Sequence, residues 1–171
     1  MHRNSMDVFE RYAAPHFTTK SRVLEISPSF EYRPTGSTAL WHTTGLNGDP
    51  RLTMQCSEYC IPVPAETYDI VYSANVIEHV REPWTWLREL TRVCVRGGLV
   101  ITICPANWPY HEDPIDCWRI YPEGMSALML AVGLEVVTCL ALYGEPHGES
   151  EHTWFPNGGI VIDTIGVGRK C

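Results

Sequence analysis

The chain has 171 residues, of which 44% are hydrophobic and 19% are charged, and its formal net charge at pH 7 is −7. This length suits one domain, residues 1–171, that buries roughly two thirds of its unfolded surface, and it leaves the choice between monomer and homodimer open. No run approaches the roughly 18 apolar residues of a membrane helix, so we expect no association with a membrane. Proteins that bind nucleic acid usually carry a basic surface, whereas this chain is acidic, so we expect a small-molecule substrate and no nucleic acid.

Residues 1–20 predict an N-terminal helix. Asn4 or Ser5 can cap its start, and Pro15 stops it. Three apolar side chains are expected to face the core: Met6, Phe9 and Tyr12. The first nine residues lack the apolar centre of a secretory signal, so we expect a cytoplasmic setting.

Strand-like and helix-like segments then alternate, which is the pattern of an α/β fold. The expected strands are short β-rich apolar runs. In chain order they are residues 22–26, 38–43, 51–56, 69–73, 99–104, 135–142 and 159–167, of which 51–56 is the weakest. Residues 99–104 are apolar throughout, as expected of a central strand that is covered on both faces and ended by Pro105.

Two further helices are predicted to begin at Pro83 and Pro122, because proline favours the first helical position. We expect Gly97 and Gly98 to end the first helix and Gly133 to end the second. The residues at helical spacing are Trp84, Leu87, Leu90 and Cys94 in the first helix and Met125, Leu128, Met129 and Val132 in the second.

Two connections have unusual sequences. Residues 27–37 contain two prolines and leave room for only one turn of helix between the first two strands. Residues 143–158 are polar and predict an exposed hairpin loop between the last two strands.

Five segments of the chain resemble one protein family in their sequence and order. They are VLEI (residues 23–26), YDIVYSANVIEHV (68–80), ELTRVCVRGGLVIT (89–102), ANWPYHEDPIDCWRIYPEG (106–124) and AVGLEV (131–136). Together they resemble class I S-adenosylmethionine-dependent methyltransferases of the methyltransferase type 11 kind. The resemblance implies a Rossmann-like α/β sheet, mostly parallel with an antiparallel C-terminal strand, in a compact version with a shortened first crossover. It also implies S-adenosylmethionine as cofactor and O- or N-methylation of a small molecule, such as a sugar or secondary metabolite.

An open α/β sheet binds its ligand beyond the carboxyl ends of the strands, at the point where the strand order reverses. The resemblance therefore implies that residues just after the strands bind the cofactor. They are Glu25, Ser27, Pro28, Ser29, Ser57, Glu58, Asn75 and Val76. Two of them have a plain alternative, since Glu25 can be a surface charge and Glu58 a solvated loop charge.

The sequence departs from the family pattern at two strand ends. Residues 27–29 read Ser-Pro-Ser in place of a G-x-G loop, whose glycines allow positive φ and close backbone approach. Residues 43–45 read Thr-Thr-Gly where the family commonly has an acidic residue for the ribose hydroxyls. Both departures favour an alternative function, a catalytically impaired methyltransferase-like binding or partner module. A dinucleotide-binding oxidoreductase fits poorly, because no G-x-G-x-x-G follows the first strand.

Methyl transfer from a sulfonium is an in-line displacement that needs alignment and only sometimes a base. His111 and His79 are the candidate bases, because imidazole titrates near neutral pH. We expect residues 105–122, the cover segment, to lie over the acceptor. Its expected substrate-facing residues are Trp108, Tyr110, Asp116 and Arg119. In the alternative, His79 only begins a helix and the cover segment is packing, in which Arg119 pairs with Asp116.

No metal is expected from the sequence. Four side chains have metal-binding chemistry but fit no common ligand spacing: His79, His111, Asp113 and Asp116. Cys56 and Cys60 have the spacing C-x3-C without a second pair. Most of the seven cysteines predict reduced core residues, because several lie in apolar runs.

Overall fold

The computed structural model of the chain describes residues 3–29, 40–144 and 160–171. Within these ranges, seven strands form one sheet in the order β3-β2-β1-β4-β5-β7-β6. The strands are β1 (Arg22–Ile26), β2 (Leu40–Gly45), β3 (Met54–Gln55), β4 (Tyr68–Ala74), β5 (Cys94–Asn107), β6 (Leu134–Tyr143) and β7 (Ile162–Lys170). The helices are α1 (Arg3–Val8), α2 (Pro83–Val93) and α3 (Pro122–Ala131), with short helical turns at η1 (Phe9–Ala13), η2 (Ala14–His16) and η3 (Ile77–His79). No helix in the described ranges is long and apolar enough to span a membrane.

The direction of the strands matches the predicted fold class. Strands β1 to β5 pair in parallel, whereas β7 runs antiparallel to both β5 and β6. The predicted α/β sheet, mostly parallel with an antiparallel C-terminal strand, is therefore confirmed. The strand order reverses between β1 and β4, so the carboxyl ends of these two strands mark the place where such a sheet binds its ligand.

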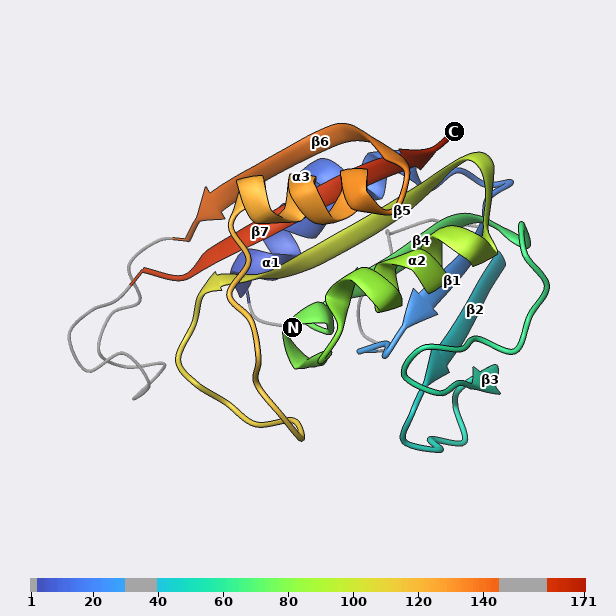
Figure 1. Ribbon diagram of the computed structural model, residues 1–171, viewed down its shortest axis with the longest axis horizontal. Helices are drawn as coiled ribbons and strands as arrows, with labels where there is room; N and C mark the ends of the chain where they lie inside the picture. The colour runs from blue at the N-terminus through green and yellow to red at the C-terminus, as the bar shows by residue number, and fades with distance from the viewer. Residues whose placement is uncertain (1–2, 30–39, 145–159) are drawn as a thin grey trace.

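Helices cover both faces of the sheet: α2 and α3 lie on one face and α1 on the other (Figure 1). Because successive side chains of a strand point to opposite faces, β5 contributes to the hydrophobic cores on both faces of the sheet. Val100 and Cys104 pack with α2 and α3, whereas Ile101 and Ile103 pack with Phe9 on the other side. The prediction of a central strand buried on both faces is confirmed.

The predicted helix end at Gly97 and Gly98 is wrong. Helix α2 ends at Val93, and both glycines lie inside β5, where the pairing register between β4 and β5 shifts. A Cβ atom on Gly98 would lie 2.7 Å from the carbonyl oxygen of Asp69. Gly98 is therefore required by the close approach of β4, and Gly97 adopts a left-handed φ of +76°.

The predicted strand end at Pro105 is also wrong. β5 continues to Asn107, and its register with β7 shifts between Pro105 and Asn107. Such an irregularity accommodates a residue that has no amide N–H to donate. The longer strand carries the start of the cover segment past the end of β4.

Helices α2 and α3 begin at Pro83 and Pro122 as predicted. Met125 and Met129 are fully buried, and α3 ends before Gly133, which has φ +82°. Of the residues at helical spacing in α2, Leu87 and Leu90 are buried, whereas Trp84 is 44% exposed.

The predicted capping role of Asn4 and Ser5 is wrong. Helix α1 already begins at Arg3, and both side chains are buried against β7. Asn4 donates a 2.7 Å hydrogen bond to Asp163, and the Ser5 hydroxyl lies 3.2 Å from the same carboxylate oxygen. Phe9 is buried as expected, whereas Met6 and Tyr12 are half-buried. The chain stays helical through Pro15, which lies within η2 rather than ending the helix before it.

Several strand bounds differ from prediction because pairing decides them. Of the predicted strand 38–43, residues 38–39 lie outside the described residues; within them β2 begins at Leu40, which pairs with Arg22, and continues to Gly45, two residues beyond the predicted end. The weak third strand shrinks to two residues that pair with Thr44 and Gly45. Much of the predicted crossover, residues 27–37, and of the hairpin loop, residues 143–158, lies outside the described residues.

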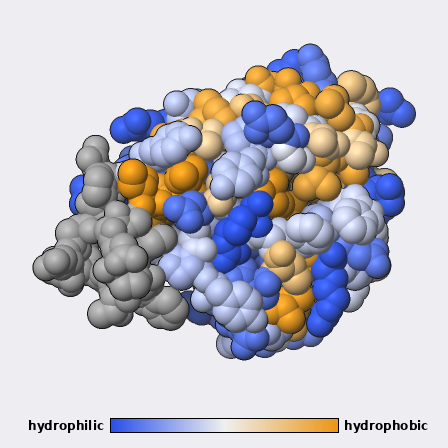
Figure 2. Space-filling model, turned by 60° about the vertical axis from the view of Figure 1, so that its left-hand side comes forward, coloured by the Kyte–Doolittle hydropathy of each residue, from blue (hydrophilic) through white to orange (hydrophobic). Residues whose placement is uncertain are grey.

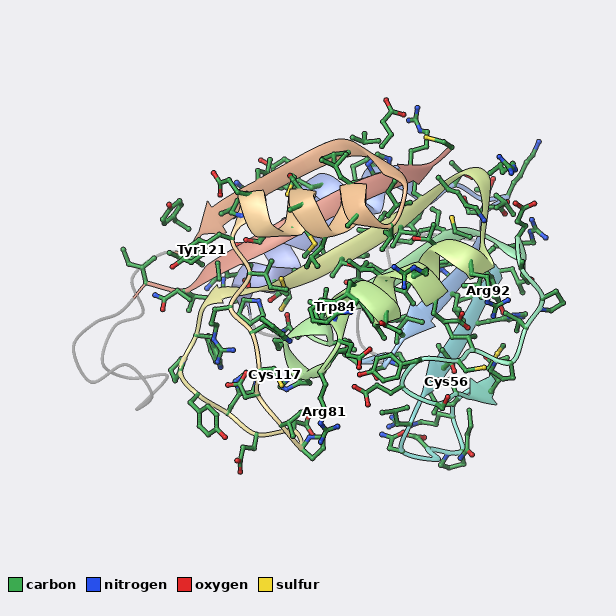
Figure 3. The ribbon with its side chains drawn as sticks, viewed as in Figure 1. Cys56, Arg81, Trp84, Arg92, Cys117 and Tyr121 are labelled. Carbon is green, nitrogen blue, oxygen red and sulfur yellow. The ribbon has the colours of Figure 1, made fainter. Side chains whose placement is uncertain are left out.

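The cysteines are all free thiols, and only Cys94 and Cys104 are buried. The expectation that most cysteines lie in the core is therefore wrong, because apolar neighbours in the sequence also occur at half-exposed strand and loop positions. Burial raises the pKa of Cys94 to about 12, so this thiol stays protonated. Cys56, beside β3, and Cys117, in the cover segment, lie far apart (Figure 3).

Apolar side chains also lie on the outside of α3 and of the edge strand β6. Figure 2 shows hydrophobic residues along the upper part of the molecule, where these two elements lie. Leu130 of α3 is 63% exposed and Tyr143 of β6 is 72% exposed. β6 is the edge strand at the end of the sheet that lies farthest from β2 and β3, so this surface is remote from those two strands.

Candidate active site

Two adjoining cavities lie beyond the carboxyl ends of β1 and β4. The larger has a volume of about 510 Å³ and the smaller about 220 Å³. Their linings share Ile26, Ser27, Ser29, Asn75, His79 and Asp113. A volume of this size fits a drug-sized or cofactor-sized ligand, and the position is the expected one for an open α/β sheet.

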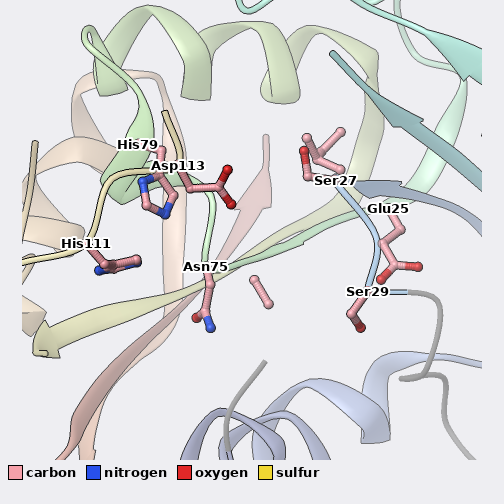
Figure 4. Close-up of a pocket in the computed structure, with 9 residues that line it drawn as sticks. Glu25, Ser27, Ser29, Asn75, His79, His111 and Asp113 are labelled. Carbon is pink, nitrogen blue, oxygen red and sulfur yellow. The ribbon is translucent and has the colours of Figure 1, made fainter. Parts of the chain in front are cut away.

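Glu25 and Ser29 lie beside each other at the end of β1 (Figure 4). Glu25 is 2% exposed, so the alternative of a plain surface charge is excluded. The hydroxyl oxygen of Ser29 is buried and has no hydrogen-bond partner among the described residues. A buried hydroxyl that lines a cavity without a partner fits a polar group of a bound ligand.

The loop after β1 makes its turn at Ser27, which has φ +49°. The amide of Ser27 donates a 2.7 Å hydrogen bond to the carbonyl oxygen of Thr44, which fixes the turn against β2. Few residues other than glycine adopt this left-handed conformation, because it brings Cβ too close to the following carbonyl. The serine therefore takes the backbone path that a glycine would take, at a cost in strain.

The end of β2 supplies no carboxylate, as the sequence indicated, but the turn that follows does. Asp49 and Asn47 line the larger cavity together with Gly45. Arg51 donates a 2.6 Å hydrogen bond to Asp49 and lowers the pKa of this carboxyl to about 2. Sequence reasoning missed Asp49, although the Asn-Gly-Asp turn after the strand was a usable signal.

Ser57 and Glu58 also line the larger cavity. Glu58 accepts hydrogen bonds from the Tyr59 hydroxyl at 2.8 Å and from the Arg81 amide at 3.2 Å, both on Oε1. The half-buried Glu58 therefore connects its loop to the segment before α2 and is not a freely solvated charge.

Asn75 follows β4 and lines both cavities, with Val76 beside it in the larger one. Asn75 has φ +54°, and its amide donates a 2.9 Å hydrogen bond to the carbonyl oxygen of Ile103 in β5. The Ser5 hydroxyl lies 3.4 Å from Oδ1 of Asn75. The predicted cofactor residues of β1 and β4 are thus brought together at one cavity.

The two candidate bases lie against each other, with ring centroids 4.9 Å apart (Figure 4). Nδ1 of His79 lies 2.5 Å from the carbonyl oxygen of Ile115, and Nδ1 of His111 lies 3.1 Å from that of Pro109. A carbonyl oxygen only accepts hydrogen bonds, so each Nδ1 is the donor. In the neutral ring each Nε2 then carries no proton and has a lone pair.

Glu78, which precedes His79 in η3, was not among the predicted site residues. It is 1% exposed, and its Oε1 lies 3.8 Å from Nε2 of His79. Burial raises the pKa of Glu78 to about 8. Nothing in the sequence distinguished Glu78 from the first residue of an ordinary helical turn.

The cover segment packs on η3. The amides of Cys117 and Trp118 donate to the carbonyl oxygen of Glu78, and the Trp118 indole donates to that of Val80 at 2.7 Å. Arg119 and Asp116 form two hydrogen bonds of 2.6 Å. Burial alone would raise the pKa of Asp116, but the hydrogen bonds from Arg119 and from the His111 amide outweigh it and lower the pKa.

Within the cover segment, His111 lines the smaller cavity, Asp113 lines both cavities, and Pro114 and Ile115 line the larger one. The four predicted substrate residues lie outside these linings: Trp108, Tyr110, Asp116 and Arg119. Tyr110 is 67% exposed and bonds to Glu112, whereas Asp116 and Arg119 support the loop that carries His111.

Comparison with known proteins assigns the chain to a family. The profile of the family described as "Methyltransferase domain" matches residues 11–102, more than half of the chain. Uncharacterised methyltransferases of Mycobacterium bovis and Mycobacterium tuberculosis are 37% identical to this chain over 62 residues. The match covers 35% of this chain and 24% of each relative, so the chain spans about a quarter of the length of these curated relatives.

Solved structures share the fold across nearly the whole chain. A SAM-dependent methyltransferase from Archaeoglobus fulgidus superposes with a TM-score of 0.71 at 14% identity, covering 97% of this chain and 93% of that one. A putative methyltransferase in complex with the Haloferax volcanii Trm112 methyltransferase activator gives a TM-score of 0.67 at 16% identity, covering 97% and 89%. These similarities confirm the predicted Rossmann-like methyltransferase sheet.

Proposed function

This chain belongs to the methyltransferase domain family, and from this premise we propose that it transfers a methyl group from S-adenosylmethionine to a small-molecule acceptor. The observation that carries the proposal is the cavity at the strand-order reversal, with Glu25, Ser29 and Asn75 on its wall and two imidazoles at its side. The acceptor is proposed to be an oxygen or nitrogen nucleophile of a compact molecule such as a sugar or secondary metabolite.

The residues on the cavity wall fit such a cofactor. Glu25 and the Ser29 hydroxyl, which has no hydrogen-bond partner in the described ranges, suit its amino-acid part, and Ser27 and Pro28 bring the backbone of the loop alongside. Asp49, which lines the larger cavity, is proposed to accept hydrogen bonds from the ribose hydroxyls. The residues proposed for the adenine and methyl ends are Ser57, Glu58, Asn75 and Val76.

The bound cofactor would supply a sulfonium methyl group that is already activated for displacement. The protein then has to align the acceptor, exclude water and receive a proton. Because Nδ1 of His79 and of His111 each donates to a carbonyl, each neutral ring presents Nε2 to a substrate, where it can accept the proton of a hydroxyl or amine. Trp108 and Tyr110 are proposed to contact the acceptor, and Asp116 and Arg119 to position His111.

A second candidate function is a catalytically impaired methyltransferase-like binding or partner module. Two observations favour it: Ser27 adopts the left-handed conformation at a cost in strain, and Glu58 already accepts two hydrogen bonds from its own chain. Both features lower the expected affinity for the cofactor relative to a glycine-loop methyltransferase.

Calorimetry separates the candidates. We expect measurable binding of S-adenosylmethionine and of its demethylated product, and a ligand at 100 times its Kd should add about 2.7 kcal/mol to the free energy of unfolding. Absence of heat and of a melting shift at millimolar cofactor would overturn both cofactor binding and methyl transfer. Binding without transfer of labelled methyl to any of a panel of hydroxyl and amine acceptors would favour the impaired module.

A further inference from the structure

We propose that Glu78, His79 and His111 bind a divalent transition-metal cation. One ligand atom from each of the three side chains lies within 4.8 Å of the other two. Two ligands come from adjacent residues of η3, and the third comes from the cover segment 32 positions later, which is why their spacing in the sequence matches no common metal motif. Binding of the cation does not depend on methyl transfer.

Both imidazoles are oriented as metal ligands usually are. A ligating histidine typically donates its other ring N–H to a carbonyl or carboxylate, which fixes the ring and leaves a lone pair for the metal. His79 makes this contact with Ile115 at 2.5 Å, and His111 makes it with Pro109 at 3.1 Å. The Asp116 carboxylate lies 3.4 Å from the same Nδ1 of His111 and adds negative charge behind the ring.

Glu78 supplies an independent indication of a bound cation. Its side chain is 1% exposed, and neither carboxylate oxygen has a hydrogen-bond partner in the described part of the chain. Its Oε1 faces Nε2 of His79 at 3.8 Å, and that nitrogen carries a lone pair in the neutral ring. Two acceptors that face each other repel unless a cation or a proton lies between them.

The nearby arginine does not hydrogen-bond to Glu78, because its donors are used elsewhere. Arg119 makes five hydrogen bonds, to both oxygens of Asp116 and to the carbonyl oxygens of Trp108, Pro109 and Trp118. These account for the five N–H groups of a guanidinium. Arg119 therefore positions the cover segment and leaves the carboxylate of Glu78 for another partner.

The ligand set selects the class of metal. Two imidazole nitrogens and one carboxylate oxygen suit zinc, iron, cobalt or manganese in the divalent state, whereas magnesium and calcium prefer all-oxygen sites. Ligand atoms around a tetrahedral zinc ion, each about 2.0–2.2 Å from it, lie roughly 3.3 Å apart. The ligand atoms of the three side chains lie within 4.8 Å of one another, so they have to move inward on binding.

The cluster opens to the smaller cavity through its two imidazoles, because His79 and His111 line that cavity and the buried Glu78 does not. Resting on the proposed function, a cation here would coordinate the acceptor atom and lower its pKa. The imidazole lone pairs would then serve the metal instead of accepting the proton directly. Metal binding and direct base catalysis are thus alternative uses of the same two nitrogens.

The test uses the full chain after removal of metals with a chelator and exchange into chelator-free buffer. Zn²⁺ titration by calorimetry should show one strong site, and Co²⁺ should give visible absorption bands of a low-symmetry site. Glu78→Gln and His111→Ala should each weaken Zn²⁺ binding by more than 100-fold, since changes to outer partners alone typically cost about 10–100-fold. His42→Ala and Cys60→Ser are matched controls that should leave the strong site unchanged.

Glu78→Gln is the decisive variant, because it preserves shape and every histidine and cysteine. A normal melting transition shows that the variant is folded. His111→Gln provides a second variant, at a ligand that is less buried than Glu78. Absence of a strong Zn²⁺ site, or a site of unchanged affinity in both Glu78→Gln and His111→Ala, would overturn the proposal. Loss of the Zn²⁺ site in these variants supports the metal proposal even if methyl transfer is never detected. Failure of one proposal therefore does not imply failure of the other.

Discussion

The side-chain amide of Asn4 donates a 2.7 Å hydrogen bond to Oδ2 of Asp163, which connects the first helix to the antiparallel strand β7 across 159 positions of the chain. Both residues are buried, at 5% and 0% exposure. Asn4→Ala removes the donor and leaves a buried carboxylate with one partner fewer, so we expect a loss of about 1–3 kcal/mol in the free energy of unfolding. Urea denaturation measures it. Asp7→Ala, on the exposed side of the same helix, should change stability by less than about 0.5 kcal/mol.

Ser27 is expected to tolerate glycine better than any other residue. Ser27→Gly removes a left-handed penalty of about 1–2 kcal/mol, partly offset by the roughly 0.5–1 kcal/mol of extra chain entropy that glycine loses on folding. The net result should be equal or higher stability and equal or tighter binding of S-adenosylhomocysteine by calorimetry. Ser27→Ala keeps the strain and removes the hydroxyl. Weaker binding in both variants would mean that the Ser27 hydroxyl contacts the ligand.

A glycine pair in β5 allows steric and conformational costs to be compared. Gly98→Ala places a methyl group 2.7 Å from the Asp69 carbonyl oxygen and 2.8 Å from the Cys94 sulfur, so the backbone of β4 or β5 has to shift. Gly97→Ala meets no atom within 4 Å but has to adopt φ +76°. We expect Gly97→Ala to cost about 1–2 kcal/mol and Gly98→Ala more. Equal melting temperatures for the two variants would contradict the expectation that the steric cost at Gly98 exceeds the conformational cost at Gly97.

Local signals in the sequence were sufficient for much of the fold. The strand at residues 22–26 and the helix starts at Pro83 and Pro122 depend on nearby residues, and each was predicted where the structure has it. Positions decided by distant contacts were not. Asn4 looks like a helix cap until Asp163 is placed beside it, and Gly98 looks like a helix stop until β4 approaches.

The same division applies to the site. Residues that follow strands, such as Glu25 and Asn75, could be placed because the parallel sheet brings all such ends to one edge. Glu78 could not, because its burial and its proximity to His111 depend on the cover segment returning over η3. Asp49 was missed because a turn, rather than the strand end itself, brings it to the cavity.

Lowering the pH should remove the contribution that Glu89 makes to the free energy of unfolding. Burial alone would raise the pKa of Glu89, but Arg92 at 2.7 Å and the Ile61 amide at 2.7 Å outweigh it, so the pKa is lowered in the folded state. A lowered folded pKa means that the stabilisation is present above the unfolded pKa of about 4.3 and is lost as pH falls through the folded value. Glu89→Gln should cost about 1–2 kcal/mol at pH 7 and progressively less below pH 4. A difference in unfolding free energy that does not change with pH would exclude this ion pair as its source.

Substitution of His111 is expected to lower turnover without lowering the stability of the fold. Its ring is half-buried on a loop, so His111→Ala should leave the melting temperature and the affinity for S-adenosylhomocysteine nearly unchanged. Turnover on the true acceptor should fall by about 10² to 10⁴ if the ring acts as a base, and by less if it only orients the acceptor. A large drop in melting temperature with unaltered rate would instead identify the cover segment as structural packing.

Arg119 tests how His111 is positioned. Arg119 is bonded to both oxygens of Asp116, and Asp116 accepts a 2.8 Å hydrogen bond from the His111 amide, so Arg119 acts on the ring only through Asp116 and the loop. Arg119→Ala should therefore lower turnover, and the same change made in a His111→Ala background should lower it little further, because the group that Arg119 positions is already absent. A double-mutant cycle on turnover and on unfolding free energy measures both couplings. Fully additive losses of turnover would mean that Arg119 contacts the substrate itself. Strong coupling in turnover, together with additive changes in unfolding free energy, is the outcome that the positioning role requires.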